Sequence, residues 1–159
     1  MTDDLEAWSA LVAVYQAVLH DVVGALEGDA QIDSGMFSAL AHVDRNGGRI
    51  PLSELQQLMY PRYSQPGLSR LVQRMEADGL VERRIDAADK RATTVQLTRA
   101  GRTRFQRADA VYRAAVDEHF LAHLNASERD RLASELQRVL ARRAQESENR
   151  TARATRTAL

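Results

Sequence analysis

The chain has 159 residues, no cysteine, and 22 basic side chains against 22 acidic ones. This length suits one domain, or one domain with an added oligomerisation element. The lack of cysteine excludes disulfides, thiolate metal sites and thiol redox sensing, which is typical of a reducing cytoplasm. No uninterrupted apolar run reaches the roughly 18 residues of a membrane span, and the first residues, MTDDLEAWSA, are acidic where a secretory signal is basic. We therefore expect a soluble cytoplasmic protein that does not bind a membrane.

The balanced charge is unevenly distributed along the chain. Residues 1–48 carry a net charge of −7, residues 49–107 carry +6, and residues 108–159 carry +1. In the middle segment every basic residue except Lys90 is an arginine, whose planar guanidinium binds phosphates and guanine edges well. This pattern favours a polyanionic partner, and the alternative is an ordinary solvated charged face.

Apolar residues at alternating steps of three and four predict a long first helix. The same helix has a second apolar face. We expect both faces to be buried, by the rest of its own domain and by another subunit. Asp33 or Ser34 is expected to cap a second helix, which ends at the NGG of residues 46–48. Pro51 suits the first turn of a third helix. The predicted seam of the first helix is Leu5, Trp8, Val12, Tyr15, Leu19, Val22 and Leu26.

Residues 64–97 have the pattern of a helix followed by a β-hairpin. Ser64 is a suitable N-cap, Pro66 falls in the first turn, and Gly79 supplies the left-handed residue that ends the helix. The third and fourth helices, joined by a short turn, form a helix-turn-helix. After Gly79 the hydrophobic period changes from 3.6 to 2, which predicts a β-hairpin over residues 81–97 and thus a winged helix.

The C-terminal part of the chain is predicted to return to helix. Thr98 is expected to cap a fifth helix, and Asn125 with Glu128 has the spacing of a capping box for a sixth. From about Gln145 the sequence has no apolar period, so we expect the tail to fray.

The predicted outward face of the fourth helix is polar and carries basic side chains. Its apolar stripe is centred near Met75, so polar residues occupy the opposite face. Arginine and glutamine read guanine and adenine edges in the major groove, while serine and a helix N-terminus suit phosphates. The alternative is an ordinary polar surface. The candidate DNA-binding residues of this helix are Ser64, Gln65, Pro66, Ser69, Arg70, Gln73 and Arg74.

The hairpin repeats the positive charge. A narrow arginine-tipped ribbon fits the minor groove, where the potential of DNA is most negative. The alternative is a surface turn held by salt bridges. Its basic residues are Arg83, Arg84, Lys90 and Arg91, with Asp86 and Asp89 placed to orient them.

Three segments, GRIPLSELQQLMY, SQPGLSRLVQRMEADGLVERR and DAADKRATTVQLTRAG, resemble the MarR family of bacterial transcription regulators, in the right order and spacing. The resemblance covers about residues 5–145. It implies a homodimer formed by the first helix and the last two, with two winged helices on a near-palindromic operator. It also implies that the fourth helix enters the major groove, that Arg91, steadied by Asp89, enters the minor groove, and that a small aromatic or phenolic ligand releases DNA. Lys90 stands where the family often has arginine, and YPRYSQPG is richer in aromatics and proline than the usual turn.

These observations predict a mainly α protein with a small β-hairpin wing. We expect an N-terminal dimerisation helix over 1–30, a winged helix-turn-helix over 31–98, C-terminal dimerisation helices over 99–146, and a frayed tail over 147–159. The predicted function is sequence-specific binding of double-stranded DNA by a ligand-responsive homodimeric repressor that requires no cofactor. The alternative is a small-molecule-binding or protein-interaction module that keeps the fold and has lost DNA binding.

Two weaker signals concern ligands. His119 and His123 lie four positions apart on one face of a predicted helix and are candidate metal ligands, although partly buried or interfacial histidines give the same pattern. Trp8, Tyr15 and His42 are candidates for an effector pocket, although aromatics at heptad spacing are often core. The sequence contains no nucleophile motif, phosphate-binding glycine loop or HExxH motif, so we do not expect an enzyme.

Overall fold

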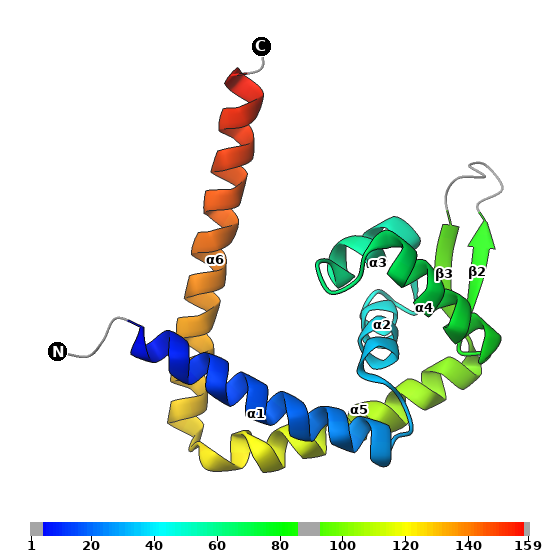
Figure 1. The fold of residues 1–159 in the computed structure, drawn as a ribbon, viewed down its shortest axis with the longest axis horizontal. Coiled ribbons are helices and arrows are strands. Elements are labelled where there is room, and N and C mark those ends of the chain that lie inside the picture. The colour runs from blue at the N-terminus through cyan, green and yellow to red at the C-terminus, as the bar shows by residue number, and fades with distance from the viewer. Residues whose placement is uncertain (1–4, 86–92, 158–159) are drawn as a thin grey trace. The chain divides into compact units, whose positions relative to one another are not determined.

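The computed structural model describes residues 5–85 and 93–157, with side chains up to Arg150. The fold is mainly helical with one small antiparallel sheet, as the sequence predicts (Figure 1). The chain divides into two compact units, residues 1–117 and 118–159. The elements that begin in the first unit are α1 (Glu6–Gly28), α2 (Ser34–Arg45), β1 (Arg49–Pro51), α3 (Leu52–Met59), α4 (Gln65–Ala77), β2 (Val81–Ile85), β3 (Thr93–Leu97) and α5 (Arg99–His119), and the last two residues of α5 belong to the second unit.

A winged helix-turn-helix forms the centre of the first unit. Helices α2, α3 and α4 pack against one another, and α2 and α3 also contact β1 and β3. The strands lie in the order β1-β3-β2 and all pairs are antiparallel. In the middle strand Val95 pairs with Ile50 on one side and with Arg83 on the other, and both Val95 and Ile50 are fully buried. The predicted hairpin is therefore confirmed.

Strand β1 is an element that the sequence pattern does not predict. It spans only Arg49–Pro51, too short for an alternating pattern to be visible. Pro51 was expected in the first turn of the third helix; it instead ends β1, with a φ of −57° and a ψ of 137°, and α3 begins at Leu52. The fixed φ of proline suits this junction as well as it suits a first helical turn.

Polar side chains and a glycine mark the helix ends as predicted. Asp33 Oδ1 accepts hydrogen bonds of 2.9 Å from two backbone N–H groups of α2, so Asp33 rather than Ser34 is its N-cap. Ser64 Oγ caps α4 and Thr98 Oγ1 caps α5 through bonds to backbone N–H groups at 3.3 and 2.9 Å. Gly79 has a φ of 69°, which ends α4 without the steric cost of a Cβ.

The core of the first unit draws on every one of its helices and strands. Met75 on α4 is fully buried, as the predicted apolar stripe requires, and no polar side chain among the described residues is buried. The aromatic rings of α2 and α5 add two stacked pairs, both of which include Phe37. Its ring centroid lies 5.9 Å from that of Phe105 and 4.9 Å from that of Tyr112. These contacts fix α5 against the helix-turn-helix.

The start of α5 also packs directly on the backbone that follows α4. Thr98 Oγ1 donates a 2.7 Å hydrogen bond to the carbonyl oxygen of Gly79, and its N–H donates to that of Leu80 at 3.1 Å. A Cβ on Gly101 would lie 1.8 Å from the Leu80 carbonyl oxygen. The threonine and the glycine of the LTRAG segment are therefore both required for this close approach.

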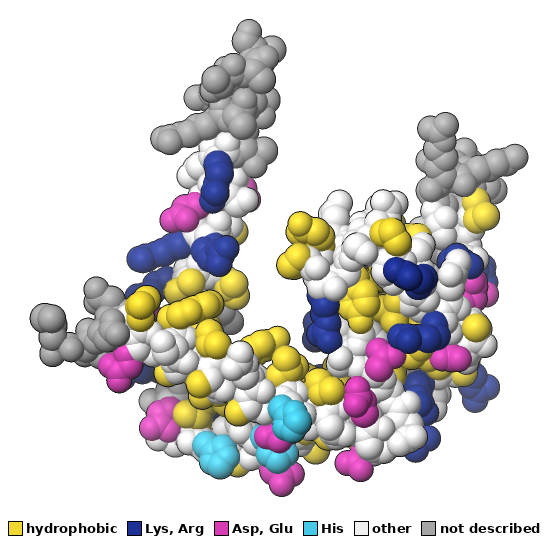
Figure 2. Space-filling model, in the orientation of Figure 1, with side chains coloured by type: hydrophobic (Ala, Val, Ile, Leu, Met, Phe, Trp, Pro, Cys, Tyr) yellow, Lys and Arg dark blue, Asp and Glu magenta, His cyan; other side chains and the backbone are white. Residues whose placement is uncertain are grey.

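Helix α1 leaves much of its apolar surface exposed. Trp8 and Tyr15 are 64% and 60% exposed, and hydrophobic side chains line the helix in Figure 2. By length and composition α1 is apolar enough to cross a membrane, since an 18-residue window has a mean hydropathy of 1.5. This differs from the sequence expectation of no sufficiently long apolar run, because isolated polar residues interrupt the run while the mean hydropathy of the window stays high enough for a membrane span. The core helix of a soluble protein passes the same test.

The second unit contains η1 (Leu121–His123) and α6 (Ala126–Thr157). The predicted capping box is confirmed, because Asn125 N–H donates to Glu128 Oε2 at 2.8 Å and Glu128 N–H donates to Asn125 Oδ1 at 3.0 Å. Along α6, apolar side chains remain exposed at Leu136, Val139 and Leu140.

The end of α6 differs from the predicted frayed tail. The helix continues from Gln145 to Thr157 although this segment has no apolar stripe. Its glutamate, glutamine, arginine and alanine residues have high helix propensity, and Glu146 precedes Arg150 by one helical turn with the favourable charge order. Local propensity thus extends the helix where the loss of apolar period predicted its end.

Candidate nucleic-acid interface

Helix α4 presents a polar face opposite a fully buried one. The buried face consists of four apolar residues, each at most 3% exposed: Leu68, Leu71, Val72 and Met75. The predicted reading residues lie on the other side, where Ser69 is half-buried and the rest are exposed. The exposed members are Ser64, Gln65, Pro66, Arg70, Gln73 and Arg74.

The first turn of α4 is suited to bind an anion. It contains no acidic residue, and Ser64 caps it. The unpaired N–H groups and the dipole of a helix N-terminus attract phosphate. Arg70 Nε makes a long hydrogen bond of 3.4 Å to the Pro66 carbonyl oxygen, which directs this side chain along the exposed face toward the same end of the helix. A guanidinium and a helix N-terminus therefore act on the same side of α4.

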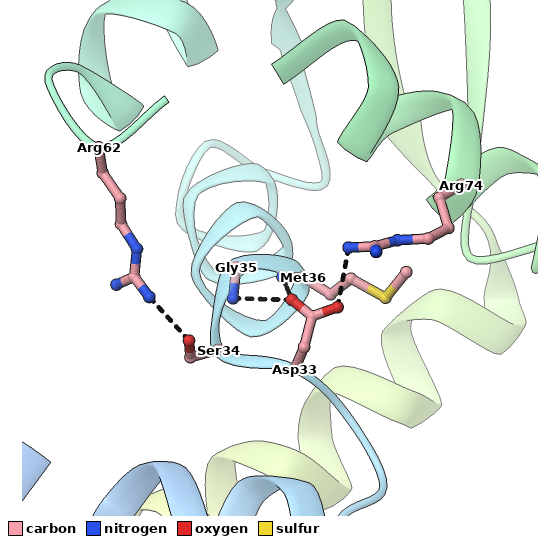
Figure 3. Close-up of polar contacts among 6 residues, drawn as sticks. All are labelled: Asp33, Ser34, Gly35, Met36, Arg62 and Arg74. Atoms are coloured by element: carbon pink, nitrogen blue, oxygen red, sulfur yellow. Dashed lines mark hydrogen bonds and ion pairs between the residues drawn. The ribbon is translucent and has the colours of Figure 1, made fainter. Parts of the chain in front are cut away.

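Arg74 has a partner that the sequence pattern did not reveal. Its Nη2 lies 2.9 Å from Asp33 Oδ2, while Asp33 Oδ1 caps α2 (Figure 3). The side chains of Arg74 and Asp33 are 57% and 39% exposed, so solvent screens the pair. One carboxylate thus connects the last turn of α4 to the first turn of α2.

The turn between α3 and α4 is fixed by contacts that sequence reasoning missed. Arg62 Nη2 donates a 2.7 Å hydrogen bond to Ser34 Oγ, as Figure 3 shows. Gln56 Nε2 donates to the Tyr63 carbonyl oxygen at 2.9 Å. The Tyr63 hydroxyl packs on Gly35, where a Cβ would lie only 1.9 Å from it. These contacts hold the turn, and with it the N-terminus of α4, against α2.

The described part of the wing is also connected to α4. Arg83 Nη2 lies 2.6 Å from Glu76 Oε2, and Glu76 Oε1 accepts the Arg83 backbone N–H at 3.0 Å. The hydrogen bonds from Arg83 lower the pKa of the Glu76 carboxyl. Arg84, a candidate DNA-binding residue, lies 2.8 Å from Glu82 on the same strand. The other wing candidates, Asp89, Lys90 and Arg91, lie outside the described residues, as does Asp86.

The effector candidates occupy different environments. Trp8 and Tyr15 lie exposed on α1, whereas His42 is half-buried on α2. Burial, followed by the nearby charge of Arg45, lowers the pKa of His42. A neutral imidazole is therefore favoured at this position.

The histidine pair of the second unit does not share one helix. His119 is the last residue of α5, and His123 ends η1, so the prediction that they lie on one helix face is wrong. The break at Phe120, which has a φ of −136°, separates the two. Across the part of the chain that the structure describes, no three histidine, aspartate or glutamate side chains gather as metal ligands would.

Both the sequence and the fold are similar to those of known proteins. Residues 36–92 match a sequence model described as the MarR family. A comparison with curated proteins gives no match. Among solved structures, AbsC from Streptomyces coelicolor, a MarR family transcriptional regulator, is 23% identical with a TM-score of 0.76 over 89% of this chain and 96% of AbsC.

Two further structures add bound partners. Sco3205, a MarR family transcriptional regulator from the same organism solved in complex with DNA, is 22% identical with a TM-score of 0.75 over 89% of this chain and 87% of its own. The organohalide-sensing regulator RdhR-CbdbA1625, in its 2,4-dichlorophenol-bound form, is 20% identical with a TM-score of 0.67 over 86% of this chain and 80% of its own. The fold described above is the fold of these proteins.

Proposed function

Residues 36–92 of this chain belong to the MarR family, and from this premise we propose that the chain is a transcriptional regulator that binds double-stranded DNA with sequence specificity. The observation that carries the proposal is the two-sided character of α4, whose inner face is buried and whose outer face presents Gln65, Arg70 and Gln73. In the major groove, arginine binds guanine and glutamine binds adenine through paired hydrogen bonds. Ser64 and the helix N-terminus bind the adjacent phosphate.

The wing is proposed to bind the neighbouring minor groove. Arg84, Lys90 and Arg91 supply the positive charge, and Asp89 orients Arg91. Replacing Arg91 by alanine should weaken binding most on A·T-rich flanks, where the minor groove is narrow and its potential most negative. Equal losses on all flanks would instead make Arg91 a simple phosphate contact.

The functional unit is proposed to be a homodimer on a near-palindromic operator. The exposed apolar residues of α1 and of α6 support this, since large apolar surface on a soluble protein marks an interface. A two-fold axis spaces two reading helices about one DNA turn apart. Light scattering on Leu140→Glu, compared with Glu146→Gln on the same helix, tests the dimer. Flotation of the protein with phospholipid vesicles would favour a membrane as the partner of α1 instead.

The decisive experiment is a gel shift with the intergenic DNA upstream of the gene, at two salt concentrations. Binding should weaken steeply with salt, with a log–log slope of about −0.9 for each phosphate neutralised. Arg70→Ala should lose about 1–3 kcal/mol and relax the preference at one base position. Arg113→Ala, which removes an exposed arginine of α5, is the matched control. Absence of any shift would favour the alternative, a module of this fold that does not bind DNA.

The regulator is proposed to act in the cytoplasm as a repressor that a small aromatic ligand releases from DNA. The dichlorophenol-bound structure of a protein with this fold supports a ligand of that kind. The candidate residues for the ligand site are Trp8, Tyr15 and His42. Isothermal titration with phenol and with benzoate, repeated on Tyr15→Ala, tests that position.

A further inference from the structure

The turn between α3 and α4 carries exposed apolar side chains that lie outside the core. Tyr60 is 72% exposed, the highest value of any large hydrophobic side chain that the structure describes. Leu58, in the last turn of α3, and Pro61 are also exposed. Figure 2 shows hydrophobic side chains on the surface over α3 and the turn that follows it. A single exposed apolar residue is common, but a cluster of them indicates a contact surface.

The other two long side chains of this turn have partners within the protein. Tyr63 packs against the core, and its hydroxyl lies against Gly35. Arg62 Nη2 donates to Ser34 Oγ, so its guanidinium is directed toward α2 (Figure 3). The backbone of Tyr60 is held by hydrogen bonds of 3.1 and 3.3 Å from its N–H to two carbonyl oxygens of α3. Its ring therefore points outward from a turn whose other side chains point inward.

The turn leads directly into the N-terminus of α4. Ser64, four residues after Tyr60, caps the helix, and the exposed Pro66 lies in its first turn. The exposed polar residues Gln65 and Arg70 belong to the same end of α4. Tyr60 and Pro66 thus place apolar surface on both sides of the cap, at the end of the helix that is proposed to enter the major groove.

We propose that Tyr60 recognises thymine, by packing its ring on a C5-methyl group at the edge of the sequence that α4 reads. The thymine methyl is the apolar group among the base edges of the major groove. Charged phosphates gain nothing from Leu58 or Pro61, and Ser64 with the helix N-terminus already supplies phosphate contacts. This inference rests on the proposed DNA binding, and adds to it a base and the residue that discriminates it.

The test removes the methyl group from the DNA and the ring from the protein. Footprinting locates the binding site in the upstream intergenic DNA, and synthetic duplexes of that site carry deoxyuridine in place of one thymine at a time. Each exchange removes one methyl group and keeps every hydrogen bond of the base pair. The wild type should bind about fourfold more weakly where the thymine that contacts Tyr60 is replaced, as expected for one methyl group lost from a buried contact.

Two variants of Tyr60 separate its ring from its hydroxyl. Tyr60→Ala should bind the thymine duplex more weakly and should no longer distinguish it from the uridine duplex at that position. Tyr60→Phe keeps the ring and should bind both duplexes as the wild type does. Tyr112→Phe, which removes a tyrosine hydroxyl from α5 and keeps the ring stacked on Phe37, is the matched control. Thermal melts of Tyr60→Ala should match the wild type, because the ring lies outside the core.

The outcomes distinguish this inference from the proposed function. If the wild type shifts no DNA, the proposed function is wrong and the inference fails with it. If the wild type shifts DNA and Tyr60→Ala retains its affinity and its response to uridine, the inference alone is overturned. An equal loss on both duplexes in Tyr60→Ala, or a Tyr60→Phe variant as weak as Tyr60→Ala, would make Tyr60 a backbone contact and overturn thymine recognition. A salt slope unchanged in Tyr60→Ala supports the proposal, because a methyl contact neutralises no phosphate.

Discussion

Asp33 performs two separable tasks, and substitutions at this one position separate them. Its Oδ1 caps α2, and its Oδ2 pairs with Arg74 at 2.9 Å. Asp33→Asn keeps an oxygen that caps the helix and removes the ion pair, so it should cost at most about 1 kcal/mol, as exposed pairs do. Asp33→Ala removes both and should cost about 1–3 kcal/mol in total, because a lost N-cap adds about 0.5–2 kcal/mol.

Urea unfolding followed by circular dichroism, at one protomer concentration, measures these differences. A double-mutant cycle of Asp33→Asn with Arg74→Ala isolates the ion pair. The coupling should be a few tenths of a kcal/mol to about 1 kcal/mol and should shrink as salt is added. Equal costs for the asparagine and alanine variants would show that the cap contributes nothing. A coupling of zero at low salt would show that the ion pair does not hold α4 in solution.

Three further predictions concern stability and its pH dependence. Gly101→Ala should lower the free energy of unfolding by about 1–3 kcal/mol, because the added Cβ overlaps a backbone carbonyl oxygen. Gly24→Ala should raise it by about 0.5–1 kcal/mol, because a Cβ at Gly24 would have nothing within 4 Å. Thermal melts compare the two variants. Arg83 lowers the pKa of the Glu76 carboxyl, so this pair stabilises the fold above the unfolded pKa of about 4.3 and its contribution is lost as the pH falls. The Glu76→Gln variant should therefore lose less stability than the wild type when the pH is lowered. Burial lowers the pKa of His42, so the wild type should lose stability as pH falls below about 6.5, and a loss of the same size in His42→Gln would contradict this.

The parts of the fold that the sequence predicts are those whose causes lie within a few residues. Ser64 caps α4 because its hydroxyl reaches a backbone N–H three positions ahead. Gly79 ends the helix because it tolerates a positive φ. The change of hydrophobic period after Gly79 predicts the wing, because the alternation of apolar and polar residues follows directly from strand geometry. The same local causes explain why the outer face of α4 is presented as predicted.

The parts that the sequence does not predict depend on partners far apart in the chain. Arg74 and Asp33 are 41 positions apart, and Arg62 and Ser34 are 28 apart. The chain has many arginines. The hydrophobic period predicts on which face of a helix or strand each arginine lies, but it does not predict which carboxylate the arginine contacts. The helical period therefore groups Arg74 with the candidate DNA-binding residues, whereas in the structure its guanidinium binds the carboxylate of Asp33, the N-cap of α2. Strand β1 was missed for a related reason, because only its pairing with β3 makes three residues a strand.

The arginines of the basic segment consequently have two kinds of role. Arg74, Arg83 and Arg102 pair with carboxylates, and Arg102 Nη1 lies 3.0 Å from Asp44 at the end of α2. Each of these exposed pairs contributes little to stability, yet Arg74 and Arg83 join α4 to different neighbours, α2 and β2, and so restrict its orientation. Arg70 remains on the outer face of the helix that they position.

This division gives salt two effects on the proposed complex. Added salt competes for the phosphates that Arg70 and the wing would neutralise, and it also screens the pairs that orient α4. If the pairs matter for reading, the penalty for a wrong base should fall with salt along with the overall affinity. Removing the Arg74–Asp33 pair should then reduce sequence discrimination at low salt while leaving the phosphate slope unchanged, because neither residue need touch a phosphate for the helix to be held in place.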